Sequence, residues 1–204
     1  MFYLEVPKKT LRFGDVVQGF ILTYPSIENP KENREFRIDI NAKDLCVLLT
    51  PCCSIKKGVI NLSPLKKVPA QYFQNPYLAE DMMRLNRKMT RYDAMRLIAR
   101  EKLSPAQIEE MKSEKDFQFL DQFVYEGNDY FQAYEVKMHD GTNAKVSYYM
   151  ISFKEIYKVE CKHIESPENY PVESKLLQLS IDARRDLAAK VNRYYRLPDE
   201  DLDG

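Results

Sequence analysis

The amino-acid sequence predicts an α+β protein: a small antiparallel SH3-like β-barrel with an inserted helical segment and a C-terminal helix. Three observations favour this class. Residues 1–70 and 117–163 are rich in β-branched and aromatic runs, residues 77–115 are not, and apolar residues recur at helical spacing after residue 180. Since strands and helices do not alternate, parallel βαβ units are not expected. Barrel closure would remove exposed strand edges; an open five- or six-stranded α+β sheet is the alternative.

Length and charge limit the number of domains and the kinds of partner that the protein can have. The 204 residues suit a single domain, and 31 basic residues balance 31 acidic ones, so there is no global attraction to nucleic acid or to membranes. Six glycines are too few for a glycine-rich nucleotide loop. Without a membrane-length apolar stretch or a signal-peptide pattern, we expect a cytoplasmic protein with reduced thiols and no membrane partner.

The first part of the barrel, residues 1–70, is expected to hold three strands. Gly14 and Asp15 form a turn signal, and β-branched or aromatic runs then alternate with polar loops that contain proline. The expected strands are 16–24, 45–50 and 59–65, and the expected loops are 25–33 and 51–58.

The helical insertion is expected over residues 77–115, as three short helices. Thr90 and Asp93 stand at the spacing of a capping box. Ser104 as N-cap, followed by Pro105 and by Gln107 three residues on, is the stronger start signal. The expected helices lie near 77–88, 91–102 and 105–115.

The second part of the barrel, residues 117–163, is expected to be a three-stranded meander. Its turn signals are Gly127-Asn128 and Asp140-Gly141, and the second is typical of a tight hairpin. A C-terminal helix follows over residues 180–196, with Ser180 as its cap. Its expected apolar face consists of Ala183, Leu187, Val191 and Tyr194.

The cysteines are the residues of this sequence best suited to metal binding or to nucleophilic catalysis. Cys52 and Cys53 follow a buried strand, and Cys161 and His163 share one face of a strand by alternation. Zinc binding by these four residues, a reactive Cys53 with His163 as its base, and simple packing all remain open. Packing is favoured, so we expect no cofactor, and we expect Cys53 to be enclosed by protein in the same core as Cys161. His139 is expected to be exposed.

The helical insertion carries the only charge asymmetry. Seven basic residues stand against two acidic ones between Met82 and Lys102. Such an excess is suited to nucleic-acid phosphates, although exposed helix faces often carry Arg and Lys for solvation alone. The candidate nucleic-acid-binding residues are Arg84, Arg87, Lys88 and Arg91.

Two motifs carry a resemblance to a family of small uncharacterised prokaryotic proteins. The first is the strand-end sequence from Thr50 to Ser54, which resembles a Thr/Ser-x-x-Cys-Asp pattern but has Pro51 where Gln is common and Ser54 where Asp is common. The second is the C-terminal pattern of Leu179, Arg184, Leu187, Tyr194-Tyr195 and Arg196. The resemblance implies an SH3-like barrel in a defence-associated or mobile-element setting, and no established activity.

The first 65 residues are also similar, more distantly, to the MazF/PemK toxin ribonucleases. Gly14-Asp15, Arg34 or Arg37, and Thr50 match residues of that family. This resemblance implies RNA cleavage, for which Thr50, Cys53, His163 and Arg37 are the candidate catalytic residues.

We therefore favour a non-catalytic binding or adaptor module whose partner is a protein or a nucleic acid. The alternatives are a MazF/PemK-like endoribonuclease and a structural zinc-binding protein. The lack of a clear acid–base pair weighs against an enzyme.

Overall fold

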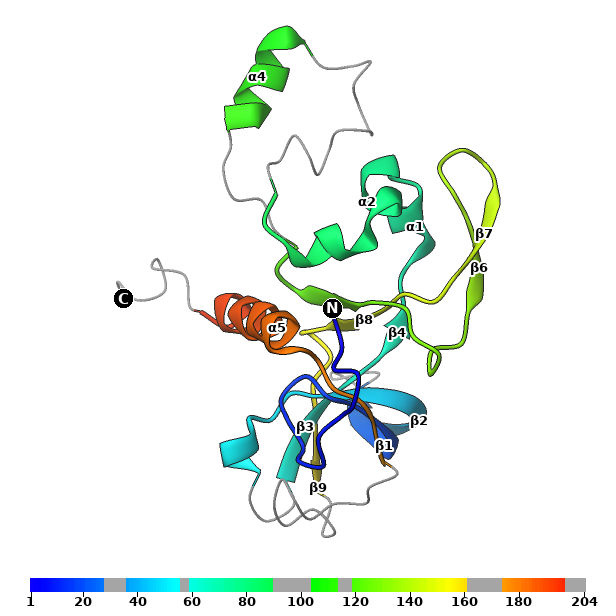
Figure 1. Cartoon of the computed structure of the whole chain (residues 1–204). Helices are drawn as coiled ribbons and strands as arrows, with labels where there is room; N and C mark the ends of the chain where they lie inside the picture. Colours follow the sequence, from blue (N-terminus) through cyan, green and yellow to red (C-terminus); the bar gives the residue numbers. More distant parts are fainter. Residues whose placement is uncertain (28–35, 56–58, 90–103, 114–118, 161–173, 197–204) are drawn as a thin grey trace. The chain divides into compact units, whose positions relative to one another are not determined.

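The computed structural model (Figure 1) describes six stretches of the chain, residues 1–27, 36–55, 59–89, 104–113, 119–160 and 174–196. The chain divides into two compact units. Unit 1 consists of Met1–Leu65 and Ser152–Arg184, and unit 2 consists of Lys66–Ile151 and Arg185–Gly204. Each unit has its own hydrophobic core. The expected organisation as a single domain stays a prediction.

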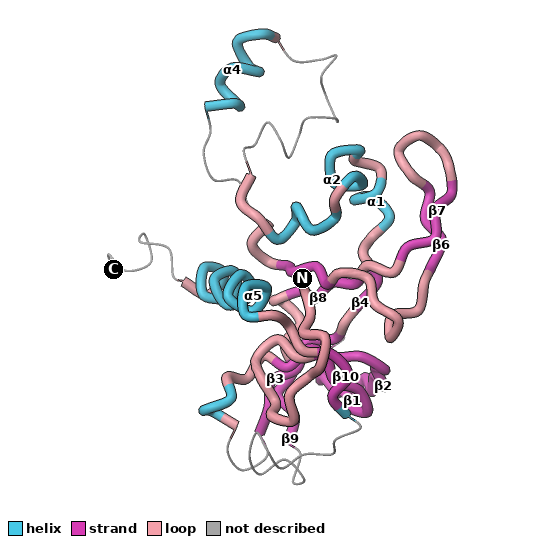
Figure 2. The backbone as a smooth tube through the Cα atoms, viewed as in Figure 1, coloured by secondary structure: helices cyan, strands magenta, loops and turns pink. Residues whose placement is uncertain are grey.

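Unit 1 is built on a five-stranded antiparallel sheet with the order β10-β1-β2-β3-β9, and its strands are drawn in magenta in Figure 2. The strands are β1 (Val16–Ile27), β2 (Phe36–Leu48), β3 (Val59–Pro64), β9 (Tyr157–Glu160) and β10 (Lys175–Leu177). The strands predicted at 16–24, 45–50 and 59–65 are confirmed, although β2 begins earlier and ends at Leu48.

The loop predicted at 25–33 begins too early. Pro25 pairs with Ile38 and Ile27 with Phe36, so β1 continues through the first three residues of that segment. Cross-strand pairing outweighs the polar composition there, because an extended backbone accepts proline where its missing N–H is not needed. The rest of the predicted loop lies outside the described residues.

The start of β1 is fixed by a glycine that the sequence marks as a turn. Gly14 has a φ of 87°, a conformation that costs other residues more, and its N–H donates to the main-chain oxygen of Leu48 at 2.7 Å. The core beneath this sheet contains Val17, Leu22, Cys46, Leu48, Ile60 and Leu62. Cys46 and Leu48 are two residues apart, as are Ile60 and Leu62, so alternation directs each of these pairs to one side of the sheet.

Unit 2 contains two small sheets. One has the order β4-β8-β5, and the other is the β6–β7 hairpin. The strands are β4 (Lys66–Lys67), β5 (Gln122–Tyr125), β6 (Tyr134–Lys137), β7 (Asn143–Val146) and β8 (Tyr149–Ser152). The predicted hairpin turn is confirmed: Lys137 pairs with Asn143 around Gly141, whose φ is 87°.

The three-stranded meander predicted over residues 117–163 is wrong. β5 and β8 lie in one sheet, β6 and β7 form a second, and β9 joins the sheet of unit 1 by pairing with β3. Turn residues determine which neighbouring segments fold back on each other, and only the Asp140-Gly141 signal does so here. The partners of β8 and β9 are distant in sequence, and alternation alone does not identify them.

No strand lies in the described residues of the helical insertion, as predicted, but its first predicted helix is broken. In place of one helix near 77–88 there are α1 (Ala70–Phe73), α2 (Pro76–Glu80) and the 3₁₀ helix η2 (Met82–Asn86). Asp81 causes the break, since it is extended and its carboxylate accepts the N–H of Met83 at 3.0 Å. The predicted helix at 91–102 lies outside the described residues.

Two helix starts agree with the caps that the sequence predicts. α4 (Pro105–Ser113) begins with a capping box in which Gln107 N–H donates to Ser104 Oγ at 3.3 Å and Ser104 N–H donates to Gln107 Oε1 at 2.9 Å. α5 (Ile181–Tyr194) begins at Ser180, whose Oγ accepts the N–H of Ala183 at 3.3 Å.

The architecture is therefore mixed α+β with mostly antiparallel sheets and few helices, which agrees with the predicted α+β class. A closed barrel is not detected among the described strands. None of the helices in the described stretches is both long enough and apolar enough to cross a membrane.

Candidate anion-binding site

Unit 2 contains a cavity of about 310 Å³ with a basic lining, called here the basic pocket. Of the described residues that line it, four have basic side chains and one has an acidic side chain. The lining consists of Asn86, Arg87, Lys88, Asp186, Ala189, Lys190 and Arg193. Because the whole chain is neutral, this local excess of positive charge is a feature of the fold and not of the overall composition.

The first side of the basic pocket comes from the end of η2. Asn86 is 6% exposed, and its side chain bonds to both main-chain groups of Val124: Nδ2 donates to the carbonyl and Oδ1 accepts the N–H, each at 2.7 Å. These two hydrogen bonds to β5 fix the point at which the chain leaves η2. Arg87 is extended and ends the 3₁₀ helix, so Arg87 and Lys88 follow directly from an anchored residue.

The second side comes from α5. Asp186, Lys190 and Arg193 are spaced by four and three residues, which places them along one face of the helix. Asp186 and Arg193 are exposed, whereas Lys190 is 2% exposed. The pocket thus has exposed charges around a buried amine.

Lys190 is the most unusual residue of the site. Its Nζ donates to the main-chain oxygen of Leu85 at 2.8 Å and lies 5.9 Å from the ring centroid of Phe123. Burial lowers the pKa of its amine to about 7, and the nearby Asp121 only partly offsets this. Among the described residues, the carbonyl of Leu85 is its one hydrogen-bond acceptor.

Arg87, in the lining of the pocket, makes one weak ion pair. Its side chain is 66% exposed, and its Nη1 lies 3.5 Å from Asp81 Oδ2. An ion pair this long and this exposed contributes little, so the guanidinium remains available to a ligand. The neighbouring Lys88 is also exposed.

Of the predicted nucleic-acid-binding residues, the structure brings Arg87 and Lys88 into the basic pocket. Arg84 has a structural role instead: its Nη1 donates to Glu80 Oε2 at 2.6 Å and to the Tyr77 carbonyl at 2.5 Å, and its guanidinium stacks 4.3 Å from the Tyr77 ring centroid. Arg91 lies outside the described residues.

Sequence reasoning missed Lys190 and Arg193. The available signal was the position of Lys190, three residues after Leu187 and seven after Ala183, on the face that both of those buried residues occupy. A lysine within an apolar stripe indicates a buried amine, which requires an acceptor or a counter-charge.

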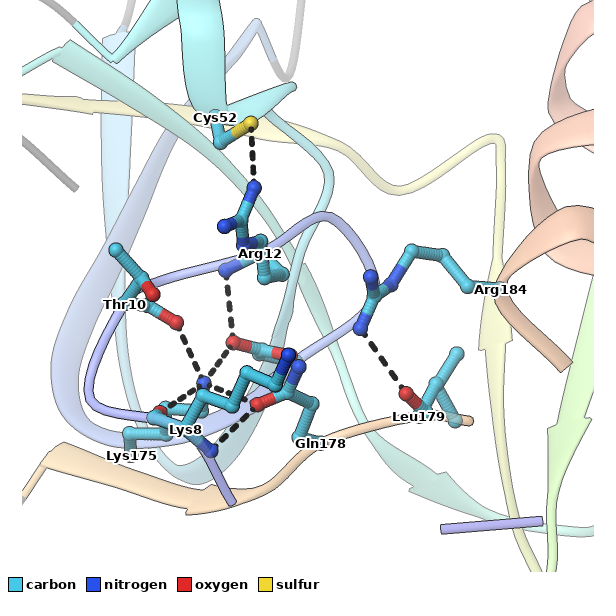
Figure 3. Close-up of polar contacts among 9 residues, drawn as sticks. Lys8, Thr10, Arg12, Cys52, Lys175, Gln178, Leu179 and Arg184 are labelled. Carbon is cyan, nitrogen blue, oxygen red and sulfur yellow. Dashed lines mark hydrogen bonds and ion pairs between the residues drawn. The ribbon is translucent and has the colours of Figure 1, made fainter. Parts of the chain in front are cut away.

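Unit 1 contains a second polar cluster, shown in Figure 3, which is structural. Lys175 Nζ lies 2.6 Å from Asp15 Oδ2, and the two side chains are 3% and 0% exposed. The same nitrogen donates to the main-chain oxygens of Lys8 and Thr10 and to Gln178 Oε1. Burial raises the pKa of Asp15 to about 6 and lowers the pKa of Lys175, although their mutual attraction opposes both shifts.

Residues that carry the family resemblance surround this cluster. Arg184 Nη2 donates to the main-chain oxygen of Leu179 at 3.0 Å, and its charge acts on Asp15. Arg12 donates to Cys52 Sγ at 3.3 Å, as Figure 3 also shows. These contacts place the first and last parts of unit 1 together.

The candidate catalytic residues are not brought together among the described residues. Thr50 is 5% exposed, and its Oγ1 accepts the N–H of Asn61 at 2.6 Å, which fits a role in holding β3. The main chain of Arg37 pairs with Ser26 in the β1–β2 hairpin, and its side chain lies outside the description. His163 lies outside the described residues.

The expectation that Cys53 is enclosed by protein is wrong, because Cys53 is exposed. β2 ends at Leu48, and the 3₁₀ helix η1 (Cys52–Ser54) follows with no buried residue of its own. Cys46 is fully buried, as expected of a packing cysteine, and Cys52 is half-buried. Cys161 lies outside the described residues.

The structure bears differently on the predicted zinc site and on the predicted exposure of His139. Within the stretches that the structure describes, no group of three or more His, Cys, Asp or Glu side chains is arranged to hold a metal ion. The zinc set of Cys52, Cys53, Cys161 and His163 is only half described, so it stays a prediction. His139 is exposed, as expected.

No family model matches the chain, and neither the curated proteins nor the solved structures gave a match.

Proposed function

We propose that this chain is a non-catalytic binding module that holds nucleic acid by its phosphates in the basic pocket of unit 2. The supporting observation is that Arg87, Lys88, Lys190 and Arg193 line one cavity, and that Asp186 is the only acidic residue among the described residues that line it. These cations come from two segments of the chain: Lys190 and its acceptor Leu85 are 105 residues apart in the sequence.

The physical case rests on charge and size. Clustered Lys and Arg side chains bind phosphates and release condensed counterions, which supplies most of the affinity for nucleic acid. The cavity of about 310 Å³ is at the small end of ligand pockets, which suits a phosphate and its sugar.

We also propose that unit 1 is a barrel of the SH3-like kind and that the chain is related to the small prokaryotic family it resembles. Two features support the barrel: a register shift between Val16 and Val17, and contact between β1 and β9, which are separated by two strands in the sheet order. Leu179 and Arg184 carry the resemblance, and they lie together, with the charge of Arg184 acting on the buried Asp15. A defence-associated or mobile-element setting belongs to this proposal.

The test is a salt series of binding to single-stranded RNA, single-stranded DNA and duplex DNA. The variant Arg87→Glu/Lys88→Glu/Arg193→Glu should bind more weakly, and its salt slope should be flatter by roughly 0.7–0.9 for each phosphate that it no longer neutralises. A matched control reverses the same charge at three exposed strand residues outside the pocket, Lys137, Lys145 and Lys158. The control should keep the wild-type slope.

Other results would change the assignment. If wild-type protein binds none of these nucleic acids at low salt, the proposal fails and a protein partner becomes the better hypothesis. If the pocket variant and the control are weakened equally, the basic pocket is not the site. Cleavage of the RNA during the assay would favour the MazF/PemK-like ribonuclease.

A further inference from the structure

We infer that the basic pocket receives the terminal phosphomonoester of a nucleic acid, with Lys190 in the pocket lining donating a hydrogen bond to it. This inference rests on the proposed function and narrows it to one chemical group. It makes Lys190 the residue that distinguishes a chain end from an internal phosphate.

The shape of the site favours a chain end. Arg87, Lys88 and Arg193 are exposed, whereas Lys190 is 2% exposed in the wall of the same cavity. An internal phosphodiester continues in both directions and therefore lies along a surface. A terminal phosphate has one free side and can enter a cavity to reach a buried amine.

Lys190 has N–H donors with which it can bind a ligand. An ammonium group has three N–H donors, and the Leu85 carbonyl is the one acceptor that Nζ has among the described residues. A phosphomonoester offers three acceptor oxygens and a charge of about −1.5 to −2 near neutral pH. An internal phosphodiester offers fewer free oxygens and a single charge, so it compensates a buried ammonium less well.

The charged groups around Lys190 favour binding of a phosphomonoester dianion. Asp121 lies close enough to raise the pKa of the amine, and Asp186 and Arg193 flank Lys190 on α5. Arg87 and Lys88 face the same cavity from the end of η2. Burial still lowers the pKa of Lys190 to about 7, because Asp121 only partly offsets the loss of water around the amine. A bound dianion would raise this pKa again, and binding would take up a proton above neutral pH.

The experiment compares oligonucleotides of one sequence, about twelve nucleotides long, which is within the span that a single binding fold covers. One has a 5′-phosphate, one a 3′-phosphate, and one only hydroxyl ends, with the reporter dye always on the other end. Wild-type protein should bind one of the phosphorylated forms about tenfold more tightly. This preference should fall as the pH rises from about 7 to about 9, because Lys190 then loses its proton.

Lys190→Met tests the residue itself. It removes the amine and nearly preserves its volume, and the ratio of affinities for phosphorylated and hydroxyl ends should fall toward one. If this variant does not fold, Arg87→Gln/Arg193→Gln changes only exposed side chains and should lower the same ratio. A nucleoside monophosphate serves as competitor, and it should displace the oligonucleotide only at far higher concentration.

Each contrary result has a separate meaning. Equal wild-type affinity for phosphorylated and hydroxyl ends overturns this inference but leaves nucleic-acid binding in place. An unchanged ratio in a folded Lys190→Met protein overturns the role of Lys190. A monophosphate that competes as well as the oligonucleotide makes the site one for free nucleotides. Binding to none of the oligonucleotides overturns the proposed function as well.

Discussion

The ammonium nitrogen of Lys190 lies 2.8 Å from the main-chain oxygen of Leu85, 105 residues earlier in the chain. This bond joins α5 to η2, the two elements that line the basic pocket. It also places an amine where water reaches poorly, which explains why burial lowers the pKa of Lys190 to about 7. The same residue therefore contributes to the pocket and carries an electrostatic cost in the unliganded fold.

That cost predicts a pH-dependent stability. The pKa of Lys190 in the folded protein, about 7, is below the ordinary value of 10.5, so the unfolded chain binds more protons between these values. The free energy of unfolding should therefore rise between pH 7 and pH 9, by on the order of 2 kcal/mol from this group. Urea denaturation across this range, with Lys190→Met as the comparison, isolates the effect. Parallel pH profiles in the two proteins would contradict it.

The buried ion pair of unit 1 gives a second prediction. Lys175→Met leaves the carboxylate of Asp15 buried without its cation and should cost about 3–5 kcal/mol. Asp15→Asn/Lys175→Met removes both charges and should recover much of that stability. Denaturant unfolding of both single variants and the double variant completes a mutant cycle. Additive effects would show that the pair is not energetically coupled.

The cysteines give a third prediction, which follows from their exposure. Cys53→Ala should change the free energy of unfolding by less than about 0.5 kcal/mol, since Cys53 is exposed, whereas Cys46→Ala should cost about 1–2 kcal/mol. Iodoacetamide labelling of folded protein, read by peptide mass spectrometry, should modify Cys53 and spare Cys46. A stoichiometric zinc ion that protects Cys53 would instead support the zinc-binding alternative.

Local signals in the sequence predict local structure well. Ser104 with Gln107, Ser180, and the Asp140-Gly141 turn act within a few residues of themselves, and each is followed by the element it indicates. Pairings between distant segments do not follow from the sequence. Val16 pairs with Leu177, and nothing in the alternation of either segment identifies the other.

Only one side of the basic pocket could be predicted from the sequence, for a related reason. Arg87 and Lys88 belong to a stretch whose excess of positive charge is visible in the sequence. Arg84 belongs to the same stretch, but its guanidinium is bound by Glu80 and by the carbonyl of Tyr77. Lys190 joins them only through the packing of α5. The apolar run before Cys53 is buried and suggests an enclosed thiol, yet β2 ends at Leu48 and Cys53 is exposed.

The most direct test of the basic pocket is to map where nucleic acid touches the protein. Single-stranded RNA containing 4-thiouridine would be crosslinked to the intact chain by light, and the modified peptides identified by mass spectrometry. We predict crosslinks in peptides that contain residues 86–88 and 186–193, and their disappearance in Arg87→Glu/Lys88→Glu/Arg193→Glu. Crosslinks confined to the strands of unit 1, or unchanged in that variant, would contradict the assignment of the pocket as the nucleic-acid site.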